Sequence, residues 1–355
     1  MNYKIRALRE KLKSLKLEGM IVFNPINIKY LTNIDPEIEG ILLITRKENI
    51  YLTYTMFIED VNKTLTIDDE IIVVDTRDVS KEEAENFFVF CENIGFEENY
   101  VTYEQFKRLK QRYRINNMAE TDGIIEKQRM IKDEQEIQNI KKACEITDKC
   151  FEYLLTYIKE GVTEKEIALE IEMFFKKNGA EDLAFDTIVA SGPNSSIPHW
   201  KPSDRKIQMA DPILIDMGCK YNGYCSDMTR TIFMGCILEE IKPVYDLVLK
   251  NQQNVLEEMR SNYNIKNISR RVEDSFKFNN YNLIHGLGHG VGLEIHEMPN
   301  INSKNESFFK EDMVVTNEPG IYLPGKYGIR IEDTVLINKS YCTPLTKSNK
   351  GYVVI

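Results

Sequence analysis

Tryptophan and histidine are scarce in this sequence, which holds one tryptophan and four histidines among 355 residues. Cysteine is neither abundant nor paired: the seven cysteines are scattered, their number is odd, and no CxxC pair occurs. This usage argues against a disulfide framework and a zinc ribbon, and it favours a reducing cytoplasm. No apolar run approaches the roughly 20 residues of a membrane-spanning helix, so we expect no insertion into a membrane.

The sequence also lacks a basic excess, and we expect no signal peptide. It has 46 Lys and Arg residues against 56 Asp and Glu residues, a net charge of −10, which argues against broad electrostatic binding to nucleic acid. Near the start, Ile5, Leu8, Leu12 and Leu15 stand at helical spacing among charged residues, not in the unbroken apolar core of a signal peptide. The length predicts about two domains.

The first third of the chain alternates helix and strand signals. After an opening helix, strand-like runs are expected at residues 20–23, 41–45, 50–54 and 71–75. A helical stretch is expected at residues 81–90, and the basic stretch at residues 107–117 is expected to be irregular. These signals predict a small α/β domain over residues 1–122.

The segment after Asp122 has a different character. Apolar residues at helical spacing predict a long amphipathic helix over residues 137–158. Thr163 and Glu166 form the capping-box pattern of a second helix, which a basic turn and Gly179 end. The chain then indicates mainly strands, broken by one long helical region at about residues 238–263. We expect a second domain over residues 123–355, and it holds all four histidines.

Two pairs of carboxylates are predicted to face each other in this second domain. Asp216 lies inside the apolar run ILIDMG, and the hairpin signal Tyr221-Asn222-Gly223 places Asp227 nearly opposite it on the return strand. Glu318 and Glu332 flank a second predicted hairpin in the same way. Facing buried carboxylates repel each other unless they share a proton or a cation.

Three of the four histidines lie within twelve residues, at His285, His289 and His296. Clustering alone is equally compatible with one shared site and with separate structural histidines. The glycines around them alternate, but Val291 breaks the GxGxxG spacing, so a dinucleotide-binding loop is excluded. Alternating glycines leave one face of an extended segment open to close approach by another chain or a ligand.

Four apolar-flanked carboxylates and one or more imidazoles fit a dinuclear metal site, because two divalent ions would neutralise the carboxylate charge. Oxygen-rich ligation with one nitrogen suits manganese, and cobalt, zinc or iron could also bind. Two such ions share bridging carboxylates and activate a water. A cysteine nucleophile is the weaker alternative, because neither Cys219 nor Cys225 has a helix N-terminus or a nearby histidine to lower its pKa.

These residues, in this order, resemble those of the pita-bread metallopeptidases, which include methionine aminopeptidase, aminopeptidase P, prolidase and the non-metallic creatinase. The resemblance implies five ligands of two metal ions, with the second and the fifth bridging the ions. They are Asp216 in IDMG, Asp227 in SDMTRT, His289 in GHGVG, Glu318 in NEPG and Glu332 in GIRIED.

The remaining histidines resemble those of the proline-peptidase branch of this family. His199 in SIPHWKP, His285, and His296 in IHEMP resemble histidines that bind substrate there and stabilise the tetrahedral intermediate. Arg330 resembles an arginine beside the bridging glutamate, where it would either fix Glu332 or form a structural ion pair behind the ligands. The resemblance therefore implies hydrolysis of the Xaa-Pro bond at the N-terminus of peptides or dipeptides, by an Xaa-Pro aminopeptidase or an Xaa-Pro dipeptidase.

The resemblance extends through nearly the whole chain. It implies a creatinase/prolidase-like N-terminal α/β domain, an α+β pita-bread catalytic domain and a homodimer. Either Glu318 or Glu332 would move the proton, and Trp200, the single tryptophan, would lie near the substrate. A methionine aminopeptidase-like enzyme and a non-catalytic peptide- or protein-binding relative are the alternatives. The length of the substrate, its preferred first residue and the native metal stay open.

Overall fold

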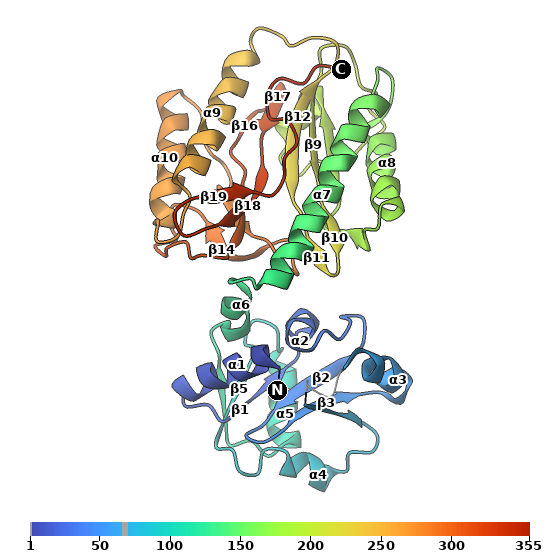
Figure 1. The fold of residues 1–355 in the computed structure, drawn as a ribbon, viewed down its shortest axis with the longest axis vertical. Helices are drawn as coiled ribbons and strands as arrows, with labels where there is room; N and C mark the ends of the chain where they lie inside the picture. Colours follow the sequence, from blue (N-terminus) through green and yellow to red (C-terminus); the bar gives the residue numbers. More distant parts are fainter. Residues whose placement is uncertain (1, 66–69) are drawn as a thin grey trace. The chain divides into compact units, whose positions relative to one another are not determined.

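The computed structural model describes residues 2–65 and 70–355. They form two compact units that divide between Arg129 and Met130, and Figure 1 shows the elements of both. The domain boundary expected near residue 122 stays a prediction, because compactness alone does not test which segment folds independently. Among the described residues, no helix is both long enough and apolar enough to cross a membrane.

The first unit is built on a mixed six-stranded sheet (Figure 1). Its strands are β1 (Gly19–Val22), β2 (Gly40–Ile44), β3 (Asn49–Thr53), β4 (Ile71–Asp75), β5 (Asn93–Phe96) and β6 (Asn117–Glu120). They lie in the order β4-β3-β2-β1-β5-β6. β2 pairs antiparallel with both of its neighbours, and the other pairs are parallel.

Six helices surround this sheet among the described residues. They are α1 (Tyr3–Ser14), α2 (Pro25–Thr32), α3 (Thr55–Thr64), α4 (Lys81–Asn86), α5 (Tyr103–Arg112) and α6 (Ile124–Arg129). Apolar side chains of α4 and α5 meet those of the strands in one core, to which Ile21, Leu43, Ala84, Ile94 and Leu109 contribute. The first unit therefore has a sheet and an apolar core of its own, as predicted.

The four strands predicted in this unit lie within one residue of β1 to β4. The helix expected at residues 81–90 is shorter, because α4 ends at Asn86 and the following turn brings Phe88 into the core.

The prediction of an irregular stretch at residues 107–117 was wrong. Its first part belongs to α5, and its last residue begins β6. A capping box between Thr102 and Gln105 starts the helix, and Leu109 is buried on its inner side. The basic residues of this stretch form the outer face of an amphipathic helix, so they do not interrupt it.

The second unit contains two sets of sheets with two helices each, and the first set follows α7 and α8 in the chain (Figure 1). Its elements are α7 (Glu134–Tyr157), α8 (Glu164–Lys177), β7 (Asp182–Leu183), β8 (Ile188–Ser191), the 3-10 helix η2 (Gly192–Ser196), β9 (Pro212–Met217), β10 (Cys219–Tyr221), β11 (Tyr224–Cys225) and β12 (Met228–Phe233). The strands form the sheets β12-β9-β8 and β11-β10-β7. Side chains of α7, α8, β9 and β12 share one apolar core.

The second set follows α9 and α10. Its elements are α9 (Lys242–Glu258), α10 (Ile265–Phe278), β13 (Gly288–Gly290), β14 (Glu297–Ile301), β15 (Val314–Asn317), β16 (Gly320–Leu323), β17 (Tyr327–Arg330), β18 (Asp333–Ile337) and β19 (Cys342–Pro344). The strands form the sheets β14-β13-β15-β18-β19 and β16-β17. Side chains of α9 and α10 pack with those of β15, β17 and β18 in another core.

The helical region expected at residues 238–263 corresponds to α9, but the strands expected directly after it were wrong, because a second helix follows. α9 ends at Glu258, and α10 starts after Asn264, whose side chain caps it. The buried residues of α10 include Ile265, Ile268, Val272 and Phe276, which is the spacing of an amphipathic helix. The helices around residues 137–177 agree with prediction, including the capping box at the start of α8.

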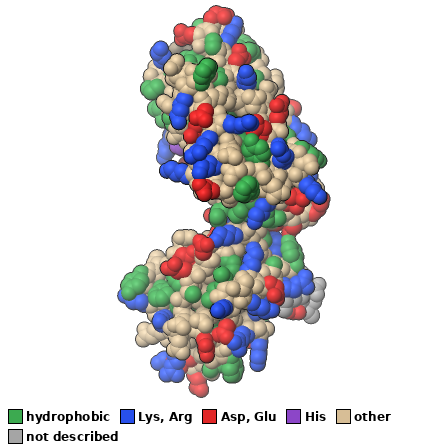
Figure 2. Space-filling model, turned by 90° about the vertical axis from the view of Figure 1, so that its left-hand side faces the viewer, with side chains coloured by type: hydrophobic (Ala, Val, Ile, Leu, Met, Phe, Trp, Pro, Cys, Tyr) green, Lys and Arg blue, Asp and Glu red, His purple; other side chains and the backbone are tan. Residues whose placement is uncertain are grey.

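Charged side chains of both signs are spread over the surface. On the face drawn in Figure 2, Lys and Arg side chains lie among Asp and Glu side chains on both units. The net charge of −10 is therefore not gathered into one acidic region in this view.

Candidate active site

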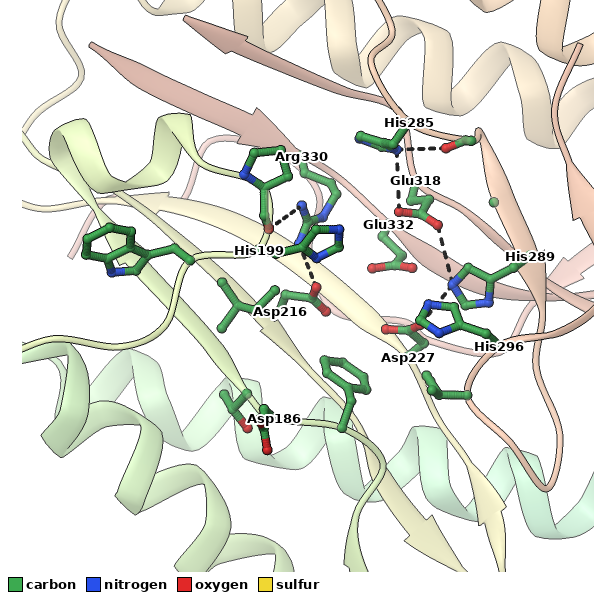
Figure 3. Close-up of a pocket in the computed structure, with 18 of the residues that line it drawn as sticks. Asp186, His199, Asp216, Asp227, His285, His289, His296, Glu318, Arg330 and Glu332 are labelled. Atoms are coloured by element: carbon green, nitrogen blue, oxygen red, sulfur yellow. Dashed lines mark hydrogen bonds and ion pairs between the residues drawn. The ribbon is translucent and has the colours of Figure 1, made fainter. Parts of the chain in front are cut away.

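A cavity of about 570 Å³ opens in the second unit. Every residue that the sequence predicted for the site lines it, and Figure 3 shows them drawn together from both sets of strands. They are His199, Asp216, Asp227, His285, His289, His296, Glu318, Arg330 and Glu332. The fold thus brings into one cavity side chains that are up to 133 residues apart in the chain.

The two aspartates come from neighbouring strands. Asp216 lies in β9, whose six residues are all buried between β8 and β12. In the antiparallel register Thr229 pairs with Asp216, and Asp227 directly precedes β12. The turn between them has Asn222 and Gly223 at positive φ, as the predicted hairpin requires. The carboxylates lie at adjacent positions of the sheet, as the hairpin predicted.

The two glutamates lie where the chain passes from one sheet to the next. Glu318 connects β15 to β16, and Glu332 connects β17 to β18. On one side Asn317 pairs with Asp333 in the ladder of β15 and β18, and on the other Gly320 pairs with Arg330 in that of β16 and β17. Matching register on both sides holds the glutamates opposite each other, as their symmetry about the second hairpin predicted.

His289 points toward these carboxylates from β13 (Figure 3). Its Nδ1 lies 3.1 Å from the carbonyl oxygen of Gly290, which can only accept, so Nδ1 carries the proton. Its Nε2 lies 3.4 Å from Asp227 Oδ2 and 3.4 Å from Glu318 Oε1. Burial, and then the charge of His296, lowers the pKa of His289 to about 4. The neutral ring therefore turns a nitrogen lone pair toward two carboxylate oxygens.

The alternating glycines around His289 give room to neighbouring backbone. A Cβ on Gly288 would lie 2.2 Å from the carbonyl oxygen of Thr316, and one on Gly290 would lie 2.2 Å from that of Met298. The close approach of another chain segment, which the sequence predicted, is thus confirmed on β15 and β14. It also lets the Thr316 hydroxyl accept from the His289 backbone N–H at 3.0 Å and donate to Glu318 at 3.2 Å.

The carboxylates are crowded and buried. Burial and mutual repulsion raise the pKa of Asp227 and of Glu332, and burial raises that of Glu318 to about 7. Ligand atoms of Asp227, His289 and Glu332 lie within 4.8 Å of one another. Among the described residues, Asp216 Oδ1 is buried with no hydrogen-bond partner. Oxygen atoms without partners, beside an imidazole lone pair, fit divalent cations, so these five side chains could hold a metal.

Arg330 is buried beside this cluster, and its guanidinium group is fully engaged. Nη2 donates to Asp216 Oδ2 at 2.6 Å, and Nη1 donates to the Tyr322 hydroxyl at 2.7 Å. Nε donates to the Thr229 hydroxyl at 3.0 Å, and that hydroxyl donates to Glu332 Oε2 at 2.6 Å. Arg330 was expected to fix Glu332, but its ion pair is with Asp216 and it reaches Glu332 only through Thr229.

His285 is held by two hydrogen bonds. Its Nδ1 lies 2.7 Å from the carbonyl oxygen of Gly286, and its Nε2 lies 3.1 Å from the Tyr322 hydroxyl. Burial, and then the charge of Arg330, lowers the pKa of His285 to about 4. A neutral ring that donates to Gly286 must accept from Tyr322, so both of its nitrogens are used within the protein. His285 was expected either to contact substrate or to orient the site, and this geometry fits orientation of the site better.

The other two histidines lie at the open side of the cavity. His296 is exposed, and its ring centroid lies 4.4 Å from that of His289. His199 is also exposed, on the segment that follows η2. Both rings can reach a molecule in the cavity without breaking a buried contact, which distinguishes them from His285.

The cysteine alternative has no support in the geometry. Cys219 and Cys225 are buried, and Cys225 Sγ faces the carbonyl oxygen of Leu293. Burial raises the pKa of both thiols, that of Cys219 to about 11. A nucleophilic cysteine needs a lowered pKa, so both are core residues, as expected.

Sequence reasoning missed Tyr322 and Thr229, which connect Arg330 to its neighbours. Thr229 acts between residues distant in the chain, since Thr229 and Glu332 are 103 positions apart, whereas Tyr322 lies 8 positions before Arg330. Thr229 had one usable signal, because the paired register of β9 and β12 places it beside Asp216. Tyr322 had one as well, because the register of the second hairpin pairs Gly320 with Arg330 and Tyr322 with Gly328, which puts Tyr322 and Arg330 on one face.

Two family models match the chain. The model of metallopeptidase family M24 covers residues 138–339, and that of the creatinase/prolidase N-terminal domain covers residues 4–131. The curated Xaa-Pro dipeptidase of Pyrococcus horikoshii is 35% identical over 359 residues, which is 99% of each chain.

Solved structures of similar proteins cover the same extent. An Xaa-Pro dipeptidase from Bacillus anthracis has a TM-score of 0.93 and 32% identity, with 99% of each chain covered. An X-Pro aminopeptidase from Thermotoga maritima has a TM-score of 0.88 and 31% identity, with 98% of this chain and 100% of that chain covered. The similarity thus includes both units.

Proposed function

This chain belongs to metallopeptidase family M24, and from that premise we propose that it hydrolyses the Xaa-Pro bond at the N-terminus of short peptides. One observation carries the proposal: Asp216, Asp227, His289, Glu318 and Glu332 converge in a single cavity. The relatives named Xaa-Pro dipeptidase match over nearly the full length, which supports the choice of bond.

The five converging side chains, Asp227 and Glu332 among them, would hold two divalent ions. Manganese is the ion that we propose, because four of the five ligands offer carboxylate oxygen. Bound divalent ions supply Lewis-acid polarisation of a carbonyl group and lower the pKa of water.

Glu318 is the proton carrier in this proposal. Its side chain is 17% exposed toward the cavity, whereas Glu332 is 2% exposed and accepts from the Thr229 hydroxyl. Glu318 Oε1 accepts from Thr316, so Oε2 is the freer oxygen. Glu318 Oε2 would take the proton from the attacking water and return it to the prolyl nitrogen, which makes that nitrogen a better leaving group.

The exposed histidines would bind the reacting peptide. His296 and His199 line the cavity from separate segments, and each imidazole ring carries an N–H group that can donate. They would hold the proline or stabilise the oxyanion that develops on the scissile carbonyl. Arg330 and His285, whose polar atoms are engaged within the protein, would position the site instead.

Dipeptides are the substrates that we favour, because the relatives named above include two dipeptidases. Longer peptides are the second candidate substrates, because the similar structures include an X-Pro aminopeptidase from Thermotoga maritima. The homodimer stays a prediction, and so does the cytoplasmic location, which seven free cysteines favour.

An initial-rate assay tests this function. The protein is stripped with EDTA, given manganese, and offered an Xaa-Pro dipeptide, a longer Xaa-Pro-Xaa-Xaa peptide and Met-Ala-Ser in parallel. Cleavage of the dipeptide alone supports the dipeptidase, and cleavage of the longer peptide supports the aminopeptidase. Cleavage of Met-Ala-Ser alone, or no cleavage by protein that binds two metal ions, contradicts the proposal.

A further inference from the structure

The cavity wall includes a segment that is not part of any strand. Residues 192–211 connect β8 to β9 and contain η2, and the side chains that line the cavity from this segment are Pro198, His199, Trp200, Lys201 and Pro202. Trp200 packs against the buried residues Ile188 and Leu214. Something must hold this segment in place, because regular pairing does not.

Glu164, the first residue of α8, provides that hold. It is 0% exposed and is not among the residues that line the cavity. Oε1 accepts from Ser191 N and Oγ, both at 2.7 Å, and from Asn194 Nδ2 at 2.9 Å. Oε2 accepts from Trp200 Nε1 at 2.9 Å, from Ser203 N at 3.0 Å and from Ser203 Oγ at 2.7 Å.

These six hydrogen bonds require a carboxylate. Backbone N–H groups and the indole N–H can only donate, so each oxygen faces at least one partner that needs an acceptor. Ionised Glu is acceptor-only at both oxygens, whereas a carboxamide must turn an NH₂ group toward one of the two sets. A buried negative charge at the first turn of a helix is also favoured by the helix dipole.

Two backbone hydrogen bonds tie the same segment to α8 without the carboxylate. Glu164 N donates to Arg205 O at 3.1 Å, and Lys165 N donates to Ser203 O at 3.1 Å. They remain when the Glu164 side chain changes, so a variant at this position keeps an attachment between helix and segment.

We propose that Glu164 is a positioning residue for the substrate cavity, which fixes Trp200 and with it the segment that carries His199. The effect of Glu164 on the position of the segment depends only on these hydrogen bonds. Its effect on peptide hydrolysis rests on the proposed function. The side chain touches neither the metal-ligating carboxylates nor the cavity, so it acts on substrate only through the segment it holds.

Glu164→Gln tests the proposal, and Glu166→Gln is the matched control. Glu166 lies two residues further on the same helix and accepts from Thr163 in a capping box that Gln also forms. We expect kcat/KM of E164Q on an Xaa-Pro dipeptide to fall about tenfold, mainly through a higher KM. Bound metal should stay at the wild-type level, and E166Q should match the wild type.

The single tryptophan gives a second readout that needs no substrate. Acrylamide quenching of Trp200 fluorescence should be stronger in E164Q than in the wild type or E166Q, because a loosened segment exposes the indole. A difference in quenching with no Xaa-Pro hydrolysis in any of the proteins would support the hold of Glu164 and contradict the proposed function.

Trp200→Phe keeps an aromatic side chain at the cavity and removes the indole N–H that donates to Glu164. This second variant tests the proposal even if E164Q fails to fold. We expect its KM to rise by about threefold or more with unchanged metal content. Wild-type quenching in E164Q, together with KM values within twofold of wild type in E164Q and W200F, would overturn the proposal.

Discussion

Arg330 and Asp216 form a buried ion pair in which Nη2 lies 2.6 Å from Oδ2, while Asp216 Oδ1 has no hydrogen-bond partner in the described part of the chain. The arginine thus occupies one oxygen of the carboxylate (Figure 3) and leaves the other oxygen buried and without a partner. A carboxylate held this way presents a single free oxygen in a fixed direction, which suits a metal ligand.

Arg330→Lys should therefore weaken the site without unfolding it. Lysine keeps the charge, but its ammonium group cannot reach Asp216, Thr229 and Tyr322 together as the guanidinium does. We expect metal affinity or kcat/KM to fall about 10- to 100-fold, as for other groups that orient metal ligands. Metal titration and initial rates measure both, and an unchanged affinity and rate would contradict this role.

Metal binding should stabilise the folded protein. The clustered carboxylates repel each other, and burial with mutual repulsion raises the pKa of Asp227 and Glu332. A cation bound only by the folded state at 100 times its Kd adds about 2.7 kcal/mol to the free energy of unfolding. Manganese added to EDTA-treated protein should raise Tm by several degrees, and Asp227→Asn should reduce that rise. An equal rise in both proteins would place the cation elsewhere.

Glu164 should give stability a measurable pH dependence. Burial opposes ionisation, but hydrogen bonds from Ser203, Asn194, Trp200 and Ser191 outweigh it and lower the pKa of Glu164. Because the pKa is below the unfolded value of about 4.3, its contribution is fully present above that pH and is lost as pH falls through the folded value. Wild-type protein should lose more unfolding free energy between about pH 5 and pH 3 than E164Q does. Urea unfolding at each pH tests this, and parallel curves would contradict it.

A second buried ion pair, between Arg230 and Asp333, contacts the backbone of Glu332. Arg230, 1% exposed, donates to Asp333 Oδ1 at 2.8 Å and also bonds the backbone carbonyl of Glu332. Arg230→Met removes one of the two cations paired with the fully buried Asp333, which keeps Lys350, so we expect a loss of about 3 kcal/mol in urea unfolding, at the lower end for a broken buried pair. The control is Asp204→Asn, which breaks an exposed pair with Lys165 and should cost under about 1 kcal/mol. Similar losses in the two variants would contradict the assignment.

Much of the site could be predicted because its ligands carry a strong local signal. A charged residue such as Asp216 inside a buried strand is costly unless a partner or a cation compensates it. The turn at Asn222 and Gly223 sets the antiparallel register of the strands on either side of it. It therefore identified Asp227 as a neighbour of Asp216 across the two strands.

The contacts that support these ligands could not be predicted. The resemblance placed Arg330 beside the bridging glutamate, but it could not tell that Asp216, 114 positions away, is its partner. Glu164 resembled an ordinary charged residue in the first turn of a helix, and its six donors come from positions 27 to 39 residues further on. α10 was missed for a different reason, because the strand-rich surroundings outweighed a clear helical spacing from Ile265 to Phe276.

The most direct test of the central claim is the rate of proline release from an Xaa-Pro dipeptide by Glu318→Gln beside the wild type. Both proteins are stripped with EDTA and then given manganese. We expect manganese-dependent release by the wild type and a rate about 10²- to 10⁴-fold lower in E318Q, the usual contribution of a general acid–base group. Unfolding curves should show E318Q still folded. Near-wild-type release by E318Q, or release by the wild type that persists after metal removal, would contradict the account.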